Sequence, residues 1–495
     1  MRASTPTVLR TLFLAGALLG TAVPAVAQAT SEEAARLQAI GEAYFGKSAA
    51  GEAPAVTVVP EADHYRASLD IGVLIRRLIA LVPDEDVKKF TLDWPASSMA
   101  LAPRADGTWR FWDYRIPKLV AEADGQRTEL VTEGIDFETI TDPKTGVTPS
   151  MKGRFGRIAA TSTVKKADDP LTVLSENVSS DVTLEGSARA TGEPGVVDAV
   201  VHQKTGSMLY ALAMSGAVAK GIPDMRFTLD GGRQDTAIGV RGLRHTALLD
   251  LWAHLVAHHD KEDFTTGQAA LKAKLSAALP IFEAVTQKVA GVDFSFTSPF
   301  GIAKAEKAAI DLDIAGLVRD GRFSMAIGFT GFQAYSLFMP KWAQKMIPTD
   351  MALAVRASGY DLASPLVAFL ESADFSTEKP LTPEQEARIG ALFLPKGAVE
   401  IAFPGNRIVG PLYDVALDGA LKASPEGARG TVTVRAKGID KVAEHLAGPT
   451  ADEQAKAVGA IVAMARQYAE RQGDDLVWRC DFDGEEITIN GKKLK

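Results

Sequence analysis

The order of apolar and polar residues along the chain predicts a protein built mainly of β-strands. A short helical stretch begins near Ser31 and contains Leu37 and Phe45. From about Ala55 to Val240, most residues then alternate between apolar and polar, which is the pattern of a half-buried strand. Turn signals such as Ala-Asp-Gly and Asp-Gly-Gly separate the alternating runs. This region therefore predicts a large antiparallel sheet, interrupted early by a helix at residues 71–82.

Helical periodicity takes over from Thr246 to about Ala290. Apolar residues recur there three and four positions apart on two successive stretches, and Pro280 is expected to end or kink the second one. Strands resume at Val292 and include a run in which isoleucine and leucine alternate with aspartate. We expect these aspartates on the solvated face of a strand. They are Asp311 and Asp313.

A weak internal repeat links three parts of the chain. The sequences around Val240, Val355 and Val434 align without a gap, and each reads as a strand that ends where a helix begins. The alignment superimposes three residues whose side chains can accept hydrogen bonds from the first turn of a helix. They are Thr246, Asp361 and Asp440. We therefore expect a recurring strand-to-helix unit with insertions of variable length.

The last part of the chain carries helix signals and two tight turns. Thr382 followed by Pro383 predicts the start of one helix, and Thr450 with Glu453 predicts the start of another, which Gly473 ends. Two strands then close the chain. The predicted tight turns are Asp483-Gly484, which joins these strands, and Asn490-Gly491, which follows them.

Together these patterns predict an α+β protein in which a large, curved antiparallel β-sheet packs against several amphipathic helices. By pattern, the chain divides into a signal peptide, a β-rich region, a helical segment, a middle β/α region and a C-terminal β/α region that closes with a β-hairpin. The predicted boundaries of these five parts are 1–29, 30–245, 246–292, 293–395 and 396–495.

The N-terminal sequence has the features of a secretory signal peptide. Arg2 and Arg10 precede an apolar run from Leu12 to Leu19, and small residues follow around Ala27 and Ala29. We expect cleavage near one of these alanines, export to a periplasm and no transmembrane anchor in the mature chain. Removal of the two arginines takes the formal net charge from −8 to about −10, without long blocks of one sign. This balance argues against nucleic acid as a partner.

The chain has a single cysteine, Cys480. Leu476, Trp478 and Phe482 stand at alternate positions around it, so we expect Cys480 to point into a core from a half-buried strand. In that setting the thiol is structural rather than reactive.

The strongest sign of metal chemistry is a cluster of histidines in the predicted helical segment. His254 and His258 have the i,i+4 spacing that lets two side chains on a helix bind one ion. Asp250 extends the same edge, but it lies eight residues from His258, about 12 Å of helix rise, so all three cannot close on one ion. Leu255 stands where metalloproteases of the HExxH type carry their glutamate base. We therefore favour a structural helix and keep a metal-dependent hydrolase using His254 and His258 as the rival hypothesis.

Three short motifs are similar to those of serine β-lactamases and penicillin-binding proteins. They lie at residues 162–165, 175–177 and 204–206. In that family the serine-lysine motif opens a buried helix and the three motifs are spread over a whole domain. Here the first motif alternates like a strand, so we do not expect this chemistry.

One segment of the middle region combines bulky apolar residues with lysines. Leu337, Phe338 and Trp342 lie close to Lys341 and Lys345. This composition suits an interfacial membrane contact or the mouth of an apolar ligand site. An ordinary buried helix is the interpretation that we favour for it.

Three strand–turn–strand pieces, at residues 114–138, 310–329 and 487–494, resemble those of secreted Gram-negative envelope proteins of the YdgA-like and AsmA-like kind. The resemblance implies an extended or curved sheet with an apolar concave face, and a role in lipid traffic or envelope upkeep. AsmA-like proteins normally keep an N-terminal membrane anchor, which this chain is expected to lose by cleavage. The resemblance assigns no functional residues.

The function that we expect from the sequence is non-catalytic. An exported protein with a large sheet and helices on one face suits the binding of a lipid or other apolar ligand, or envelope maintenance. The alternatives are the metal-dependent hydrolase described above and a structural or protein-interaction module of the envelope. We assign no catalytic, cofactor-binding or metal-binding residues and no cofactor, and the expected partners are a lipid or apolar ligand and envelope proteins.

Overall fold

The computed structural model confirms a mixed α+β protein that is strongly dominated by antiparallel sheet. Strands hold 54% of the described residues and helices 21%. The structure describes residues 28–47, 54–73, 75, 91–123, 125–165, 171–216, 223–257, 267–377, 379–449 and 451–493. The predicted signal peptide, up to residue 27, and most of the helix predicted at 71–82 lie outside these residues.

The chain forms two compact units, each assembled from separate stretches of sequence. The first unit comprises residues 1–225, 237–283 and 367–383. The second comprises residues 226–236, 284–366 and 384–495.

The first unit contains most of the N-terminal strands. They are β1 (Val56–Glu61), β2 (His64–Leu69), β3 (Thr91–Asp93), β4 (Ser97–Pro103), β5 (Trp109–Arg115), β6 (Leu119–Ala123), β7 (Gln126–Glu133), β8 (Asp136–Asp142), β9 (Val147–Lys165), β10 (Thr172–Ala190), β11 (Val197–Thr205), β12 (Ser207–Ser215) and most of β14 (Gln234–Leu243). Its helices include α2 (Ser31–Phe45), α5 (His245–Ala257) and α7 (Gln268–Ala277).

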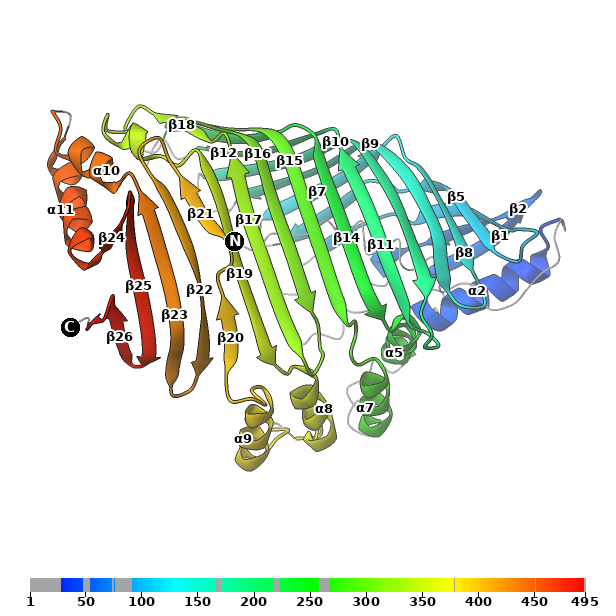
Figure 1. The fold of residues 1–495 in the computed structure, drawn as a ribbon. Helices are drawn as coiled ribbons and strands as arrows, with labels where there is room; N and C mark the ends of the chain where they lie inside the picture. The colour runs from blue at the N-terminus through cyan, green and yellow to red at the C-terminus, as the bar shows by residue number, and fades with distance from the viewer. Residues whose placement is uncertain are drawn as a thin grey trace. The chain divides into compact units, whose positions relative to one another are not determined.

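Helix α2 covers the strands at the N-terminal end of the first unit (Figure 1). The Thr30 side chain accepts a hydrogen bond from the Glu33 amide at 3.2 Å, which satisfies one of the free N–H groups at the helix start. Leu37 on α2 packs with buried Trp109 and Phe111 of β5. A second core, around Phe137 and Phe155, lies between β8, β9 and β10. The first unit thus has cores built from large side chains.

The second unit contains the remaining strands. They are β13 (Met225–Gly231), β15 (Ala284–Ser298), β16 (Gly301–Ala315), β17 (Gly321–Thr330), β18 (Gln333–Ser336), β19 (Asp350–Tyr360), β20 (Val399–Ala402), β21 (Asn406–Val409), β22 (Asp414–Ser424), β23 (Gly427–Lys437), β24 (Glu470–Gln472), β25 (Asp475–Gly484), β26 (Glu486–Ile489) and β27 (Lys492–Lys493). Its helical elements include η3 (Ala343–Met346), α10 (Ile439–Leu446), α11 (Glu453–Tyr468) and most of α9 (Pro383–Leu392), and α8 (Ala363–Ser372) begins in it.

In the second unit the buried core lies at one border of the sheet. Helices α10 and α11 stand beside β24 and β25 (Figure 1). Val442 and Leu446 of α10 pack with Ala455 of α11, and Trp342 and Met346 lie against this cluster. The Trp478 indole also donates a hydrogen bond to the Ala465 carbonyl of α11 at 2.8 Å.

The structure corrects the extent of the predicted helical segment. Helix α7 ends at Ala277, ahead of Pro280 as expected, but the helical pattern predicted to reach about Ala290 does not continue. Strand β15 already begins at Ala284, because residues 284–298 pair along their whole length with β16.

Each of the three aligned sequences is a strand followed by a helix, as predicted: β14 leads to α5, β19 to α8 and β23 to α10. Of the three predicted caps, only Asp361 is confirmed, since its Oδ1 accepts from the Ser364 amide at 2.8 Å. Thr246 lies inside α5. Gly438, with a positive φ, is the N-cap of α10, and Asp440 instead forms ion pairs with arginines.

Other helix boundaries were predicted with mixed success. Helix α9 begins at Pro383, and the turn at Asn490-Gly491 is confirmed. The turn that joins β25 to β26 lies one residue later than predicted, at Gly484-Glu485, because Asp483 still pairs with Glu486. For α11 the prediction was wrong at both ends. Asp452 is the N-cap, accepting from the Ala455 amide at 2.8 Å, and Thr450 lies outside the described residues. The helix ends at Tyr468 rather than Gly473, because the intervening residues form β24 and pair with β25.

Among the residues that the structure describes, none of the helices is both long and apolar enough to cross a bilayer.

Candidate functional site

One face of the sheet in the second unit is apolar across its strands. Directly paired residues of antiparallel strands lie on the same face. The register places Ile310 of β16 opposite Val289 of β15 and Ile327 of β17. Ile327 also pairs with Leu353 of β19. Further paired residues on this face include Leu312, Met325, Val355, Met351, Ile408, Ile401, Leu421, Val415, Leu417, Val434 and Trp478. We call this surface the apolar face.

The opposite face of the same strands is polar. Lys288 of β15 pairs with Asp311 of β16, and Asp313 pairs with Ser324 of β17. Asp311 and Asp313 therefore lie on the polar face, as the alternation predicted. The sheet of this unit is thus two-sided, with apolar residues on one side and charged and hydroxyl side chains on the other.

In the part of the chain that the structure describes, the large side chains that β15, β16, β17 and β19 place on the apolar face are not buried as they would be in a protein core. Among the described residues of β15, β16, β17 and β19, the buried ones are all small. They are Ala284, Gly291, Ala315 and Gly321. Ile310 is 50% exposed and Met325 is 37% exposed, although both belong to the apolar face. Apolar area left in water costs about 25 cal/mol per Å², so such a face is a surface on which an apolar ligand gains free energy by binding.

Asp293 keeps the apolar face continuous along β15. Its φ of 56° lies in the left-handed region, which aspartate tolerates better than most residues. A Cβ atom on Gly291 would lie 2.5 Å from Phe294 Cζ, so the Phe294 ring lies on the same side of the strand as Gly291. In a regular strand, residues three apart point to opposite faces. The left-handed conformation of Asp293 interrupts the alternation, so Phe294 and Phe296 lie on the same side of the strand as Val289.

Four phenylalanines form the end of the apolar face at the turn between β15 and β16. The Phe227 ring centroid lies 6.5 Å from that of Phe296 and 6.3 Å from that of Phe300. The Phe300 centroid lies 6.2 Å from that of Phe338, which follows β18. These spacings are typical of aromatic pairs. Because Phe300 is 46% exposed, the cluster is a surface feature, and we call it the aromatic rim.

The segment that contains Phe338 does not form the buried helix that we favoured. Strand β18 ends at Ser336, and a turn follows that presents Leu337 and Phe338 to solvent. The only helical element in the segment is the short 3-10 helix η3. Its apolar side chains divide between the solvent and the cluster at α10, and no single helical face collects them.

The structure describes only one of the two histidines of the metal hypothesis, which stays untested. His254 lies in the last turn of α5, and His258 lies outside the described residues. Asp250, on the same helix, has its carboxylate 3.9 Å from Lys274 Nζ of α7. Within the described ranges there is no group of three or more histidine, cysteine or acidic side chains arranged to hold a metal ion.

The remaining sequence candidates have structural positions. Ser162 of the serine-lysine motif lies in β9, directly opposite Ser175 of β10, so this motif forms strand as predicted. Cys480 is a free, half-buried thiol on β25, paired with Val432 and Ile489. Burial, helped by the neighbouring Asp481 carboxylate, raises the pKa of Cys480. A raised pKa leaves the thiol protonated and unreactive at neutral pH.

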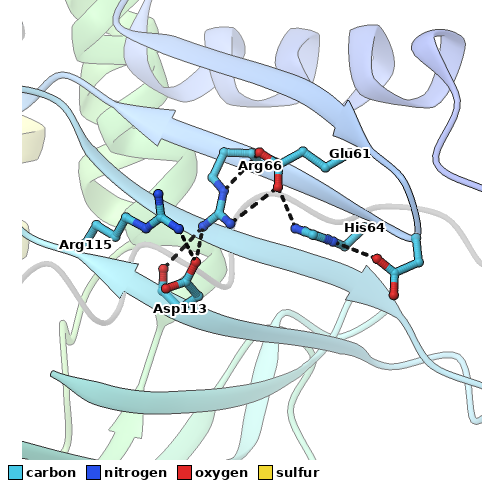
Figure 2. A network of polar contacts seen from close by, with 6 residues as sticks. Glu61, His64, Arg66, Asp113 and Arg115 are labelled. Atoms are coloured by element: carbon cyan, nitrogen blue, oxygen red, sulfur yellow. Dashed lines mark hydrogen bonds and ion pairs between the residues drawn. The ribbon is translucent and has the colours of Figure 1, made fainter.

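A network of charged residues joins β1, β2 and β5 in the first unit (Figure 2). Arg66 extends between Asp113 (Nη1 to Oδ2, 2.8 Å) and Glu61 (Nη2 to Oε2, 3.4 Å). His64 Nε2 lies 2.8 Å from the same Glu61 oxygen, and Arg115 lies 2.8 Å from Asp113. The network thus links a hairpin to a strand that is distant in sequence.

The chemistry of this network is that of a structural clamp. The hydrogen bond from Arg66 holds the pKa of Glu61 below its usual range. The hydrogen bond from Arg115, together with that from Arg66, does the same for Asp113. Carboxylates with a lowered pKa are weak bases at neutral pH, whereas general base catalysis needs a pKa near the working pH. We therefore place the functional surface on the apolar face and not here.

No family model, curated protein or solved structure matches the chain. The resemblance to YdgA-like and AsmA-like envelope proteins stays a prediction.

The sequence singled out one of the four phenylalanines of the aromatic rim and not the other three. Phe338 was part of the segment singled out for its apolar and basic composition, but Phe227, Phe296 and Phe300 were not. Phe294 and Phe296 alternate like ordinary strand residues, so nothing local marks them. The contact of Phe296 with Phe227 depends on the pairing of β13 with β15, more than sixty residues along the chain.

Proposed function

We propose that this is an exported, periplasmic, non-catalytic protein that binds a lipid or another apolar ligand along the apolar face of its second unit. The observation that carries the proposal is that the strands β15, β16, β17 and β19 leave large apolar side chains half-buried or exposed on one face. The export itself rests on the N-terminal sequence pattern. In this proposal the sheet curves around its ligand, with the amphipathic helices and the recurring strand-to-helix units at its borders.

An acyl chain is the ligand whose chemistry fits this surface. Ile310, Met325 and Leu353 are uncharged apolar side chains on the neighbouring strands β16, β17 and β19. Apolar side chains therefore follow one another across the sheet at the distance between neighbouring strands. Each methylene group removed from water contributes about 0.8 kcal/mol. A chain that crosses several strands would therefore gain affinity without any specific polar contact. Such a site favours length and flexibility of the ligand over a particular head group.

The test places one charge on the apolar face and a matched charge on the polar face of the same strand. Ile310→Glu introduces a carboxylate among apolar side chains, whereas Ala309→Glu introduces it at the adjacent, exposed position of the other face. The probe is a fluorescent hexadecanoic acid analogue, titrated into delipidated mature protein. We expect Ile310→Glu to weaken probe binding by at least about tenfold, because burying a carboxylate without a partner costs more than 1.4 kcal/mol.

Ala309→Glu should bind the probe within about twofold of the wild type, which is less than 0.5 kcal/mol. Equal affinity of the two variants would refute binding on this face. If the wild type neither binds the probe nor yields lipid when it is purified gently and extracted, a structural or protein-interaction module becomes the better reading. One zinc ion per chain in elemental analysis of the same sample would instead favour the hydrolase hypothesis with His254 and His258.

A further inference from the structure

The two most exposed large apolar side chains of the described structure are neighbours in sequence, and one of them belongs to the aromatic rim. Leu337 is 73% exposed and Phe338 is 76% exposed. The Phe338 ring contacts the Phe300 ring, so this pair extends the apolar face outward. We call residues 336–342 the rim loop. A soluble protein gains nothing by displaying two large apolar side chains together at a loop tip unless something covers them.

The rim loop is held in this position at both ends. Ser336 Oγ donates to the Phe300 carbonyl at 2.6 Å and accepts from the Phe338 amide at 3.3 Å. At the other end, His445 Nε2 lies 2.8 Å from the Trp342 carbonyl oxygen. The Trp342 side chain packs against the cluster that contains Leu446. These contacts hold Leu337 and Phe338 in their exposed position. The loop therefore loses little conformational entropy when it binds.

The rim loop and the residues that follow it up to Thr349 carry only positive charge in their sequence, in a chain whose net charge is −8. Lys341 and Lys345 are exposed, and no acidic residue occurs between Gly331 and Thr349. In the part of the chain that the structure describes, neither lysine is paired with a carboxylate. Two apolar side chains flanked by free ammonium groups match the interface of a bilayer that contains anionic lipids.

We propose that the rim loop docks the protein on an anionic bilayer, with Leu337 and Phe338 inserted below the head groups and Lys341 and Lys345 at the lipid phosphates. This proposal rests on the proposed function and deepens it. Docking would bring the aromatic rim, and through it the apolar face, to the membrane surface from which a lipid is taken or to which it is delivered.

The experiment is flotation of delipidated mature protein with two kinds of vesicle. One is phosphatidylglycerol mixed with phosphatidylethanolamine, and the other is phosphatidylcholine alone. We expect binding to the anionic vesicles and weak binding to the neutral ones. Leu337→Ser with Phe338→Ser should lower binding to anionic vesicles by at least about tenfold, because both inserted side chains are lost.

Two matched controls separate the effect of the rim loop from nonspecific hydrophobic adsorption and from a change in net charge. Ile461→Ser with Met464→Ser removes two other exposed apolar side chains, on α11, and should leave flotation unchanged. Lys341→Glu with Lys345→Glu should abolish the preference for anionic vesicles. Lys379→Glu with Lys396→Glu makes the same change in net charge at exposed lysines elsewhere and should have little effect.

The fatty acid probe distinguishes failure of this proposal from failure of the proposed function. Lys341→Glu with Lys345→Glu, which leaves the apolar face and the aromatic rim unchanged, should still bind the soluble probe with wild-type affinity, whereas Ile310→Glu should still float with anionic vesicles. Wild-type protein that binds the probe but no vesicle would overturn docking alone. Docking is also overturned if the rim loop variant floats like the wild type, or if sedimentation shows a dimer that the same two substitutions dissociate, since a second copy would then cover the loop.

Discussion

Tyr114 lies where the two cores of the first unit meet. Its ring makes an edge-to-face contact with Phe137, with centroids 5.1 Å apart, and its hydroxyl lies 3.1 Å from Thr139 Oγ1. Burial raises the pKa of Tyr114 to about 12, although the hydrogen bond with Thr139 lowers it slightly. The neutral phenol is therefore the form that the folded protein favours.

This residue predicts a loss of stability at high pH. The folded pKa exceeds the unfolded value of about 10, so the contribution of Tyr114 is fully present below pH 10 and is lost as the pH rises toward 12. Two pKa units correspond to about 3 kcal/mol of unfolding free energy as an order of magnitude. Urea unfolding at several pH values between 9 and 12 should show a steeper loss for the wild type than for Tyr114→Phe. Parallel curves for the two proteins would contradict the prediction.

Among the elements, β19 depends on a side chain to complete its hydrogen bonds. Strand β20 pairs with residues 356–358 of β19, and β21 pairs with residues 350–352. Ala354 lies between these two paired stretches and has no strand partner on that side. The buried Asn406 side chain takes the place of this partner: its Oδ1 accepts from the Ala354 amide at 2.5 Å, and its Nδ2 donates to the Ala354 carbonyl at 3.0 Å. The side-chain amide thus replaces the backbone amide of a missing strand residue.

Replacement of this side chain should destabilise the second unit strongly. Asn406→Ala leaves the N–H and C=O of Ala354 without partners, and each such group costs about 1–3 kcal/mol. We expect a loss of about 2–4 kcal/mol in unfolding free energy, measured by urea unfolding. Arg407→Ala, which breaks an exposed ion pair with Asp414, is the matched control and should cost at most about 1 kcal/mol. A loss for Asn406→Ala no larger than that of the control would show that water satisfies Ala354.

The elements also show what sequence alone could predict. The alternation of Ile310, Asp311 and Leu312 predicted both the strand and its polar face, because a period of two is a local property. The start of α11 was misassigned because threonine and aspartate are both good caps, and only the fold selects Asp452. The sequence pattern could not predict that Ile310 is half exposed. The exposure of a strand residue depends on which distant segments of the chain cover the strand.

For the molecule as a whole, the division into two units could not be predicted from pattern. Residues 226–236 belong to the second unit and residues 237–283 to the first, so the chain changes unit after Thr236. Composition does not change at this point. Likewise, the aromatic rim joins phenylalanines that are far apart in sequence, and strand pairing alone brings them together.

The two units should differ in local stability because their cores differ. In the first unit, β4 and β5 carry fully buried Leu101, Trp109 and Phe111. In the second, β16 and β17 bury only small residues at their ends. All four strands are hydrogen-bonded, but opening β16 or β17 exposes less buried apolar surface and so costs less free energy.

Hydrogen exchange measured by mass spectrometry on delipidated protein tests this difference. We expect amides of β16 and β17 to exchange at least about tenfold faster than those of β4 and β5, which corresponds to 1.4 kcal/mol in opening free energy. Saturation with the fatty acid probe should slow exchange in β15, β16, β17 and β19 and leave β4 and β5 unchanged, because a ligand stabilises only the unit that it binds. Uniform protection of all strands without ligand would mean that the apolar face is covered in solution, and the ligand-binding proposal would lose its physical basis.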